Sequence, residues 1–409
     1  MTTLPMTVPA FGVEEHYWIA EADGMASRAQ MRAASGAYES SVPPRIADLD
    51  TPIPGDLAAD IDEATAALTR FDVHAAMRLG ESSPVLGPMS SILLRTESTS
   101  SSRIENLTVG AYQLALAEIG QSTSENARLV AANVRTMEAA IRLSADLSQE
   151  AILAMHRTLL ADTPGWESHA GQYRNQLVWI GTSNITPRGA AYIAPQPEHV
   201  QPAMTDLVAF LDRDDMPAIA QAAIAHAHFE TIHPFADGNG RTGRALVHAA
   251  LRNKGVVTHT TAPVSAGLLT DTTHYFAALT SYRQGDARPI IERFTAASRY
   301  AATTGLRLVN DLAGQLDQAR HTLEVAGLRP QATAFRVLPI LISNPVITAR
   351  LLCDTFTIDS KTAQRAITQL AEAGIIDERT GRKKNRVWRH VGILTVLDAY
   401  AQNIDRRTP

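Results

Sequence analysis

Cysteine is nearly absent from this chain. Cys353 is the only one, so no disulfide can form within the chain. Such usage is typical of a reducing compartment, and we expect a cytoplasmic protein. The first residues lack a charged segment followed by an apolar run, and no apolar run approaches the ~20 residues of a membrane span. We therefore expect neither a signal peptide nor a membrane partner.

An excess of positive charge is also lacking. The 409 residues carry a net charge of −5, so the chain as a whole has no electrostatic preference for nucleic acid. Aromatic residues make up only 5% of the chain, but 45% of its residues are hydrophobic, which is ordinary for a globular protein. The length corresponds to two or three domains.

Chemistry-bearing side chains gather in one stretch, His233-Pro-Phe-Ala-Asp-Gly-Asn-Gly-Arg-Thr-Gly-Arg244. Gly238 and Gly240 flank Asn239, and glycine lets a backbone approach a ligand closely and turn its N–H groups toward an anion. The residues after this loop show helical spacing, so the loop is predicted to lead into a helix N-terminus, which attracts phosphate. Arg241 and Arg244 are three residues apart and would share one face of that helix.

Two further residues of the stretch suit phosphate chemistry. Asp237 is placed to hold Mg²⁺, which proteins bind through one or two carboxylates together with substrate phosphates. His233 precedes the turn and is the candidate general base. Two other interpretations remain open: a basic turn without chemistry, or a metal cluster of His226, His228, Glu230 and His233.

The stretch resembles the signature of the Fic family, His-x-Phe-x-(Asp/Glu)-Gly-Asn-Gly-Arg-x-x-Arg, at every specified position. The resemblance implies a protein adenylyltransferase, which transfers AMP from ATP to a hydroxyl side chain of a target protein. It implies that His233 is the base, Asp237 holds Mg²⁺, and Arg244 holds the γ-phosphate. Gly238, Asn239, Gly240 and Arg241 would bind the remaining phosphate oxygens, with the Asn239 amide taking part.

A second motif lies upstream. Ser101, Glu105 and Asn106 match (Ser/Thr)-x-x-x-Glu-(Gly/Asn), which resembles the inhibitory helix motif of Fic proteins. That resemblance implies that Glu105 inhibits the enzyme by holding Arg244. The alternative is a capping box, in which a serine followed by a glutamate begins a helix.

Residues 171–195 read as two short strands joined by turn residues. A lone hairpin in a helical protein has an exposed edge that can pair with an extended peptide. The segment resembles the flap of Fic proteins, so the target protein is expected to bind there. A plain structural hairpin is the alternative.

The fold expected from these patterns is mainly α. Residues 1–88 would form an N-terminal arm, loosely ordered to about residue 54, and a helical region. Residues 89–326 would form the all-helical Fic core with its inhibitory helix and flap. Residues 327–409 read as three helices and a two-stranded wing, which resembles a winged helix-turn-helix domain.

The recognition face of that domain would carry Lys361, Gln364, Arg365 and Thr368, and the basic wing tip at 379–386 could contact phosphates. Both DNA binding and a role in protein contacts or dimerisation stay open for it. For the whole chain, the main hypothesis is an autoinhibited adenylyltransferase. The alternatives are a hydrolase that removes AMP, with Glu105 positioning water, and a DNA-binding regulator with a Fic sensor core.

Overall fold

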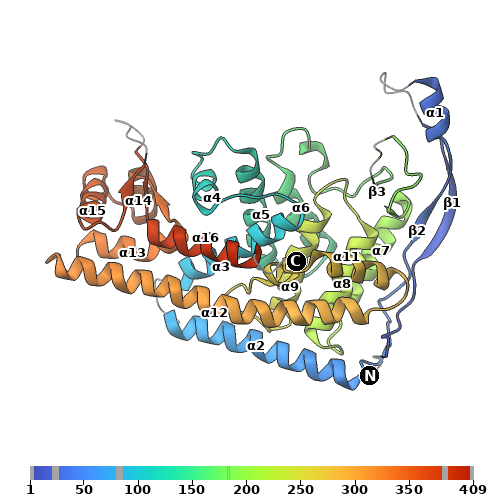
Figure 1. The fold of residues 1–409 in the computed structure, drawn as a ribbon, viewed down its shortest axis with the longest axis horizontal. Helices are drawn as coiled ribbons and strands as arrows, with labels where there is room; N and C mark the ends of the chain where they lie inside the picture. Colours follow the sequence, from blue (N-terminus) through green and yellow to red (C-terminus); the bar gives the residue numbers. More distant parts are fainter. Residues whose placement is uncertain are drawn as a thin grey trace. The chain divides into compact units, whose positions relative to one another are not determined.

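The computed structural model describes residues 4–20, 27–79, 86–181, 183, 185–379 and 386–405 (Figure 1). The chain forms two compact units, each assembled from separate stretches. Unit 1 comprises Met1–Glu63, Thr136–Gly255 and Thr273–Thr295, and unit 2 comprises Ala64–Arg135, Val256–Thr272 and Ala296–Pro409. The three regions predicted from the sequence stay a prediction. Among the described residues, no helix is both long and apolar enough to cross a membrane.

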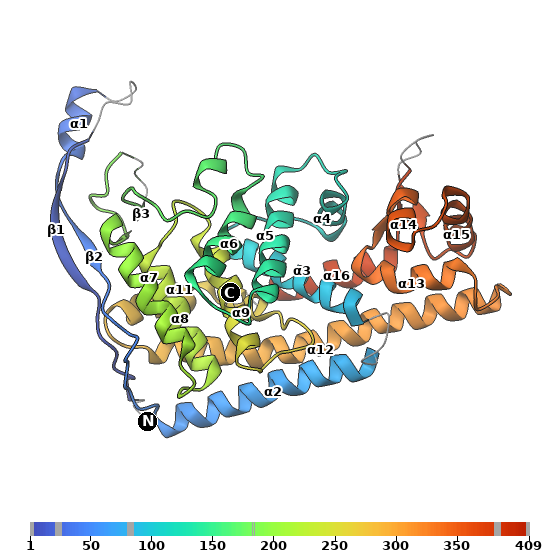
Figure 2. The same ribbon diagram turned by 180° about the vertical axis from the view of Figure 1, so that it is seen from behind.

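Unit 1 is built mainly from helices that surround a very apolar central one. Its elements are β1 (Gly12–Trp18), α1 (Arg28–Ala34), β2 (Gly36–Val42), α6 (Gln149–Leu160), a 3-10 turn (Glu167–His169), β3 (Trp179–Ile180), β4 (Tyr192–Ile193), α7 (Pro197–Asp212), α8 (Ala218–Ile232), α9 (Asn239–Asn253) and α11 (Thr272–Arg283). Helix α8 is buried along nearly its whole length, as its run of alanines and isoleucines predicts. It packs beside α9 (Figures 1 and 2).

Unit 2 holds the second set of helices and a small sheet. Its elements are α3 (Leu86–Ile104), α4 (Ala111–Glu118), α10 (Val264–Leu269), α13 (Thr333–Ser343), β5 (Val346–Ile347), α14 (Ala349–Phe356), α15 (Ser360–Glu372), β6 (Asp377–Glu378), β7 (Trp388–Arg389) and α16 (Val391–Asp405). Three long helices, α2 (Gly55–Leu79), α5 (Glu125–Arg142) and α12 (Arg288–Val325), contribute residues to both units. The mainly helical class predicted from the sequence is confirmed.

The N-terminal prediction was wrong. Instead of a loosely ordered arm, β1 and β2 form an antiparallel ribbon in which Gly12 is paired with Val42 and Trp18 with Gly36. Seventeen residues, including α1, separate the two strands, so the sequence lacks the short two-residue loop that usually signals a hairpin.

The ribbon is anchored on the predicted flap, so the flap is not a lone hairpin. The indole N–H of Trp18 donates to the carbonyl of Ile185 at 2.8 Å, and the Thr186 hydroxyl donates to the carbonyl of Ala34 at 2.7 Å. The flap strands themselves are confirmed: Trp179 pairs with Ile193 and Ile180 with Tyr192.

The C-terminal segment has the three predicted helices and the predicted strand pair β6–β7. Strand β5 adds a third strand, giving the order β5-β7-β6. Asp359 caps α15, because its carboxylate accepts the N–H groups of Lys361 and Thr362. The wing tip at 380–385 lies outside the described residues, and the winged-helix assignment stays a prediction.

Candidate active site

His233 occupies the residue that ends α8. Its backbone is left-handed, with φ 51° and ψ 60°, and its N–H donates to the carbonyl of Phe229 at 2.9 Å. A non-glycine residue in this region is strained by roughly 1–3 kcal/mol, which is common at functional sites. Its Nδ1 lies 3.2 Å from the carbonyl oxygen of Glu230. Because a carbonyl can only accept, Nδ1 carries the proton and the lone pair of the neutral ring lies on Nε2.

The loop after His233 leads directly into the N-terminus of helix α9. Gly238 has φ 77°, and a Cβ there would lie 2.7 Å from a methyl group of Leu159, so only glycine fits. Helix α9 begins at Asn239, two residues earlier than predicted, and its first internal bond runs from the Thr242 N–H to the Gly238 carbonyl at 3.0 Å. Gly238, the residue before the helix, has no side chain that could cap this end. The N–H groups of residues 239–241 lie at the helix N-terminus, where such groups commonly face an anion.

The Asn239 side chain is bonded to the backbone of its own loop. Its Oδ1 accepts the Phe235 N–H at 2.9 Å, and its Nδ2 donates to the Phe235 carbonyl at 2.8 Å. The side chain is buried and braces the loop. The bond to Phe235 uses one of the two N–H groups of the amide, so the predicted contact between the Asn239 amide and a reacting phosphate stays a prediction.

Arg241 and Arg244 lie on α9 as predicted, and both are buried, with 4% and 3% of their surface exposed. Gly243 between them allows close packing, since a Cβ there would lie 2.9 Å from the Phe229 ring. A guanidinium nitrogen of Arg241 lies 3.2 Å from Oδ2 of Asp237, whose side chain is 44% exposed. The loop therefore offers one accessible carboxylate beside two buried cations.

His156 also holds this loop, although the sequence suggested only a structural or surface histidine. Gly171 donates its N–H to Nδ1 at 3.0 Å, so Nε2 carries the proton and donates to the carbonyl of Asp237 at 3.0 Å. The ring stacks on Phe235 with 3.7 Å between centroids. Burial lowers the pKa of His156 to about 4, which keeps it neutral near pH 7.

Arg174 joins the flap to the end of α8 and was likewise missed. Its guanidinium donates to the carbonyls of His233 at 2.7 Å, Gln176 at 2.8 Å and Pro195 at 2.6 Å. Burial lowers its pKa to about 10, still well above neutrality. Nothing local in the sequence marks either residue, because all of these partners except Gln176 lie far from it along the chain.

Two of the residues considered as alternative metal ligands, His226 and His228, contact tyrosine hydroxyls. His226 Nε2 lies 2.7 Å from the hydroxyl of Tyr275, and His228 Nδ1 lies 3.0 Å from that of Tyr282. Burial lowers the pKa of each histidine to about 3. Among the described residues, no group of three or more His, Cys, Asp or Glu side chains could hold a metal ion.

The upstream motif lies in unit 2, at the C-terminal end of α3. Asn106 has φ 63°, a left-handed conformation that ends helices, and Leu107 donates its N–H back to the Ser102 carbonyl at 3.0 Å. The capping-box alternative was wrong, because Ser101, Glu105 and Asn106 finish a helix and do not begin one. Ser101 is buried and Glu105 is half-buried.

Comparison with known proteins adds sequence similarity to this geometry. Residues 146–251 match the model of the Fic/DOC family. The chain contains a Fic domain. The protein adenylyltransferase fic-1 of Caenorhabditis briggsae is 34% identical over 149 residues, which are 36% of this chain and 26% of that protein. The protein adenylyltransferase Fic of Nematostella vectensis is 31% identical over 159 residues, which are 38% of this chain and 33% of that protein.

The chain thus spans about a quarter to a third of these curated relatives, and the matches centre on the Fic domain. A solved structure of a Fic family protein from Desulfovibrio desulfuricans G20 covers 83% of this chain and 97% of its own, with a TM-score of 0.51 and 23% identity. At that identity the likeness concerns the fold.

Proposed function

We propose that this chain transfers AMP from ATP to a hydroxyl side chain of a target protein. The observation that carries the proposal is the strained turn from α8 to α9, which sets His233 beside a helix N-terminus with two buried arginines. Matches to proteins named protein adenylyltransferase over this part of the chain support it.

In this proposal His233 removes the proton from the target hydroxyl through Nε2, the nitrogen that its contact with Glu230 leaves unprotonated. The N–H groups of Gly240 and Arg241 hold oxygens of the α-phosphate, and Arg244 holds the γ-phosphate. Since phosphoryl and nucleotidyl transfer demand little covalent chemistry from a protein, positioning and charge account for most of the rate.

The residues present also fit Mg²⁺. Asp237 supplies one exposed carboxylate next to the phosphate-binding loop, and Mg²⁺ commonly takes one or two carboxylates with phosphate oxygens and water. When bound, the ion would neutralise charge on the leaving pyrophosphate. His156 and Arg174 would keep the loop and His233 in place through their backbone contacts.

Inhibition by Glu105 acting on Arg244 is the regulatory part of this proposal. Its basis is the match of Ser101, Glu105 and Asn106 to the inhibitory pattern. Glu105→Gly should therefore be faster than the unmodified chain.

The test is incubation of the full chain with labelled ATP, CTP, GTP or UTP, followed by mass spectrometry of the modified protein. We expect a mass gain of one AMP from ATP in Glu105→Gly, and none in Glu105→Gly/His233→Ala. No modification by any nucleotide would count against transfer. If protein already carrying AMP lost it in the same mixture, the hydrolase alternative would replace transfer.

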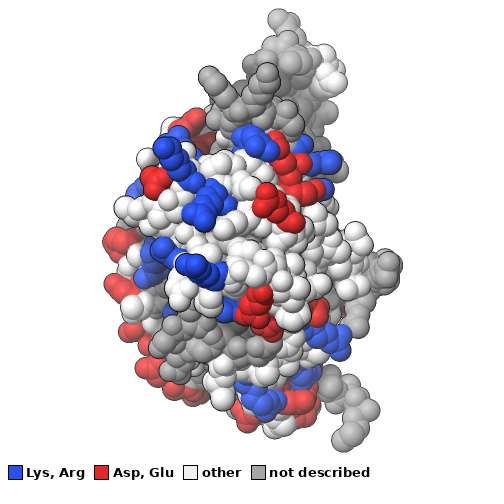
Figure 3. All heavy atoms as spheres, turned by 90° about the vertical axis from the view of Figure 1, so that its left-hand side faces the viewer, with Lys and Arg blue, Asp and Glu red and all other residues white. Residues whose placement is uncertain are grey.

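DNA binding by residues 327–409 is a second candidate. One observation favours it: Lys361, Arg365 and Thr368 are exposed on α15. On the face drawn in Figure 3, where α13 to α15 lie, positive and negative side chains are interspersed, and Arg389 is paired with Asp377 at 2.9 Å. Titrating the full chain with duplex DNA at several salt concentrations tests it, since phosphate contacts weaken as salt rises.

A further inference from the structure

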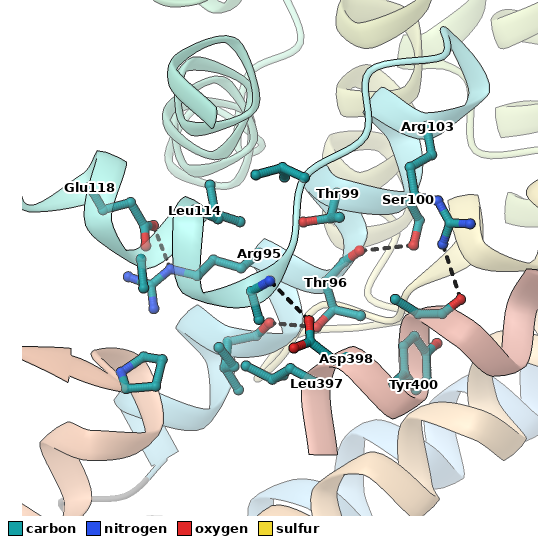
Figure 4. A pocket seen from close by; sticks show the side chains of 16 residues that line it. Arg95, Thr96, Thr99, Ser100, Arg103, Leu114, Glu118, Leu397, Asp398 and Tyr400 are labelled. Carbon is teal, nitrogen blue, oxygen red and sulfur yellow. Dashed lines mark hydrogen bonds and ion pairs between the residues drawn. The ribbon is translucent and has the colours of Figure 1, made fainter. Parts of the chain in front are cut away.

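The short connection between α3 and α4 carries Glu105 and Asn106, and it is held at both ends by α16. Two residues before its start, Nη1 of Arg103 donates to the carbonyl of Ala401 at 3.1 Å. At its far end, the N–H of Ala111 donates to Oδ1 of Asp398 at 3.0 Å. Figure 4 shows both bonds reaching the same helix.

Each of these two hydrogen bonds forms at the end of a helix, where the charge of the side chain is favourable. Ala111 is the first residue of α4, and Gly110 before it has no side chain that could cap the helix. Asp398 therefore caps α4 from another element, with a carboxylate at the positive end of the helix. Ala401 lies near the C-terminal end of α16, where carbonyl groups attract a cation such as Arg103.

Helix α16 is itself fixed to the C-terminal part of the chain. Leu394 packs in a buried cluster with Val346 and Val387 beside the small sheet and with Ala115 of α4. The Tyr400 hydroxyl lies 3.2 Å from Oγ1 of Thr304 on α12. Only His390 separates β7 from α16, so a displacement of the sheet would be passed to this helix.

We propose that α16 positions the Ser101–Asn106 segment, with Arg103 and Asp398 as the positioning residues. The regulatory meaning rests on the proposed function, in which Glu105 restrains the active site. Loosening either contact lets the segment leave its inhibitory position, and the transfer rate rises. A partner that binds the C-terminal segment and displaces α16 would change the transfer rate through the same two contacts.

The test uses the full chain with Asp398→Ala and Asp398→Asn, each alone and combined with Glu105→Gly. Asparagine keeps an oxygen that can accept the Ala111 N–H, so it is the matched control. We expect Asp398→Ala to raise auto-modification by labelled ATP about fivefold, equivalent to about 1 kcal/mol. Asp398→Asn should stay near the unmodified rate, and Arg103→Met should act in the same direction as Asp398→Ala.

Two comparisons decide whether the effect passes through Glu105. In the Glu105→Gly background, Asp398→Ala should change nothing further. If Asp398→Ala slows that background, the residue serves only the stability of the fold and the inference is overturned. If Glu105→Gly is activated but Asp398→Ala alone is not, the inference is also overturned while the proposed function stands.

Hydrogen exchange of residues 104–111 separates the inference from the proposed inhibition. We expect faster exchange in Asp398→Ala than in Asp398→Asn, because the capped N–H loses its acceptor. If Glu105→Gly fails to activate, the proposed inhibition is wrong, and the exchange result alone then decides whether α16 positions the segment. Equal exchange in the two variants would refute that role.

Discussion

Replacing His156 by phenylalanine tests how the phosphate loop is held. Phenylalanine keeps a flat ring against Phe235 but loses the bonds to Gly171 and Asp237. The buried Gly171 N–H and the partly buried Asp237 carbonyl then lack their partner, at a cost of roughly 1–3 kcal/mol each. At pH 7.5 we therefore expect His156→Phe to be less stable by about 2–4 kcal/mol, with a lower transfer rate.

The difference in stability between the unmodified chain and His156→Phe should also depend on pH. The pKa of His156 is lowered from 6.5 to about 4 in the folded chain, so the unfolded chain binds the proton first as the pH falls. The contribution of neutral His156 to the free energy of unfolding is fully present above pH 6.5 and is lost as the pH falls from 6.5 to 4. That shift corresponds to roughly 3 kcal/mol. The stability gap between the unmodified chain and His156→Phe should therefore nearly close at pH 4.

Urea unfolding between pH 7.5 and 4 measures the gap. Trp18, Trp166 and Trp179 all lie in unit 1, so tryptophan fluorescence reports mainly on the unit that contains His156. A gap for His156→Phe that stays constant from pH 7.5 to 4 would show that His156 is not held neutral by the fold.

Four further outcomes are expected from transfer assays in the Glu105→Gly background. His233→Ala should keep ATP affinity but lose about 10²–10⁴-fold in rate, the usual value of a general base. Asp237→Ala should lose activity together with its dependence on added Mg²⁺, and an unchanged Mg²⁺ titration would remove Asp237 from that role. Arg174→Lys should lower the transfer rate roughly tenfold and leave ATP affinity unchanged, because one ammonium group cannot span the three carbonyls that the guanidinium holds. Equal losses in transfer rate and in ATP affinity would contradict a role for Arg174 in positioning His233. Gly238→Ala should weaken ATP binding, and normal binding would refute the close fit at that turn.

The sequence predicted the candidate site well because the site is contiguous. His233, Asp237 and the two arginines fall within twelve residues, and their order alone places them around one loop. Several helices were also predictable, because their apolar residues recur at helical spacing, as those of α12 do over Arg288–Val325.

Contacts between residues that lie far apart along the chain could not be predicted from the sequence. The bond from His156 to Asp237 spans 81 positions and that from Ala111 to Asp398 spans 287, so no local pattern marks either. The ribbon of β1 and β2 was missed for the same reason, because its two strands are separated along the chain.

The most direct test of AMP transfer is to compare ATP labelled on the α-phosphate with ATP labelled on the γ-phosphate. Glu105→Gly is incubated with each in the presence of Mg²⁺, and label on protein is measured after unbound nucleotide is removed. Transfer of AMP predicts incorporation of the α-label alone, and none with Glu105→Gly/His233→Ala. Incorporation of the γ-label, or of the α-label at an equal rate without His233, would contradict the proposed function.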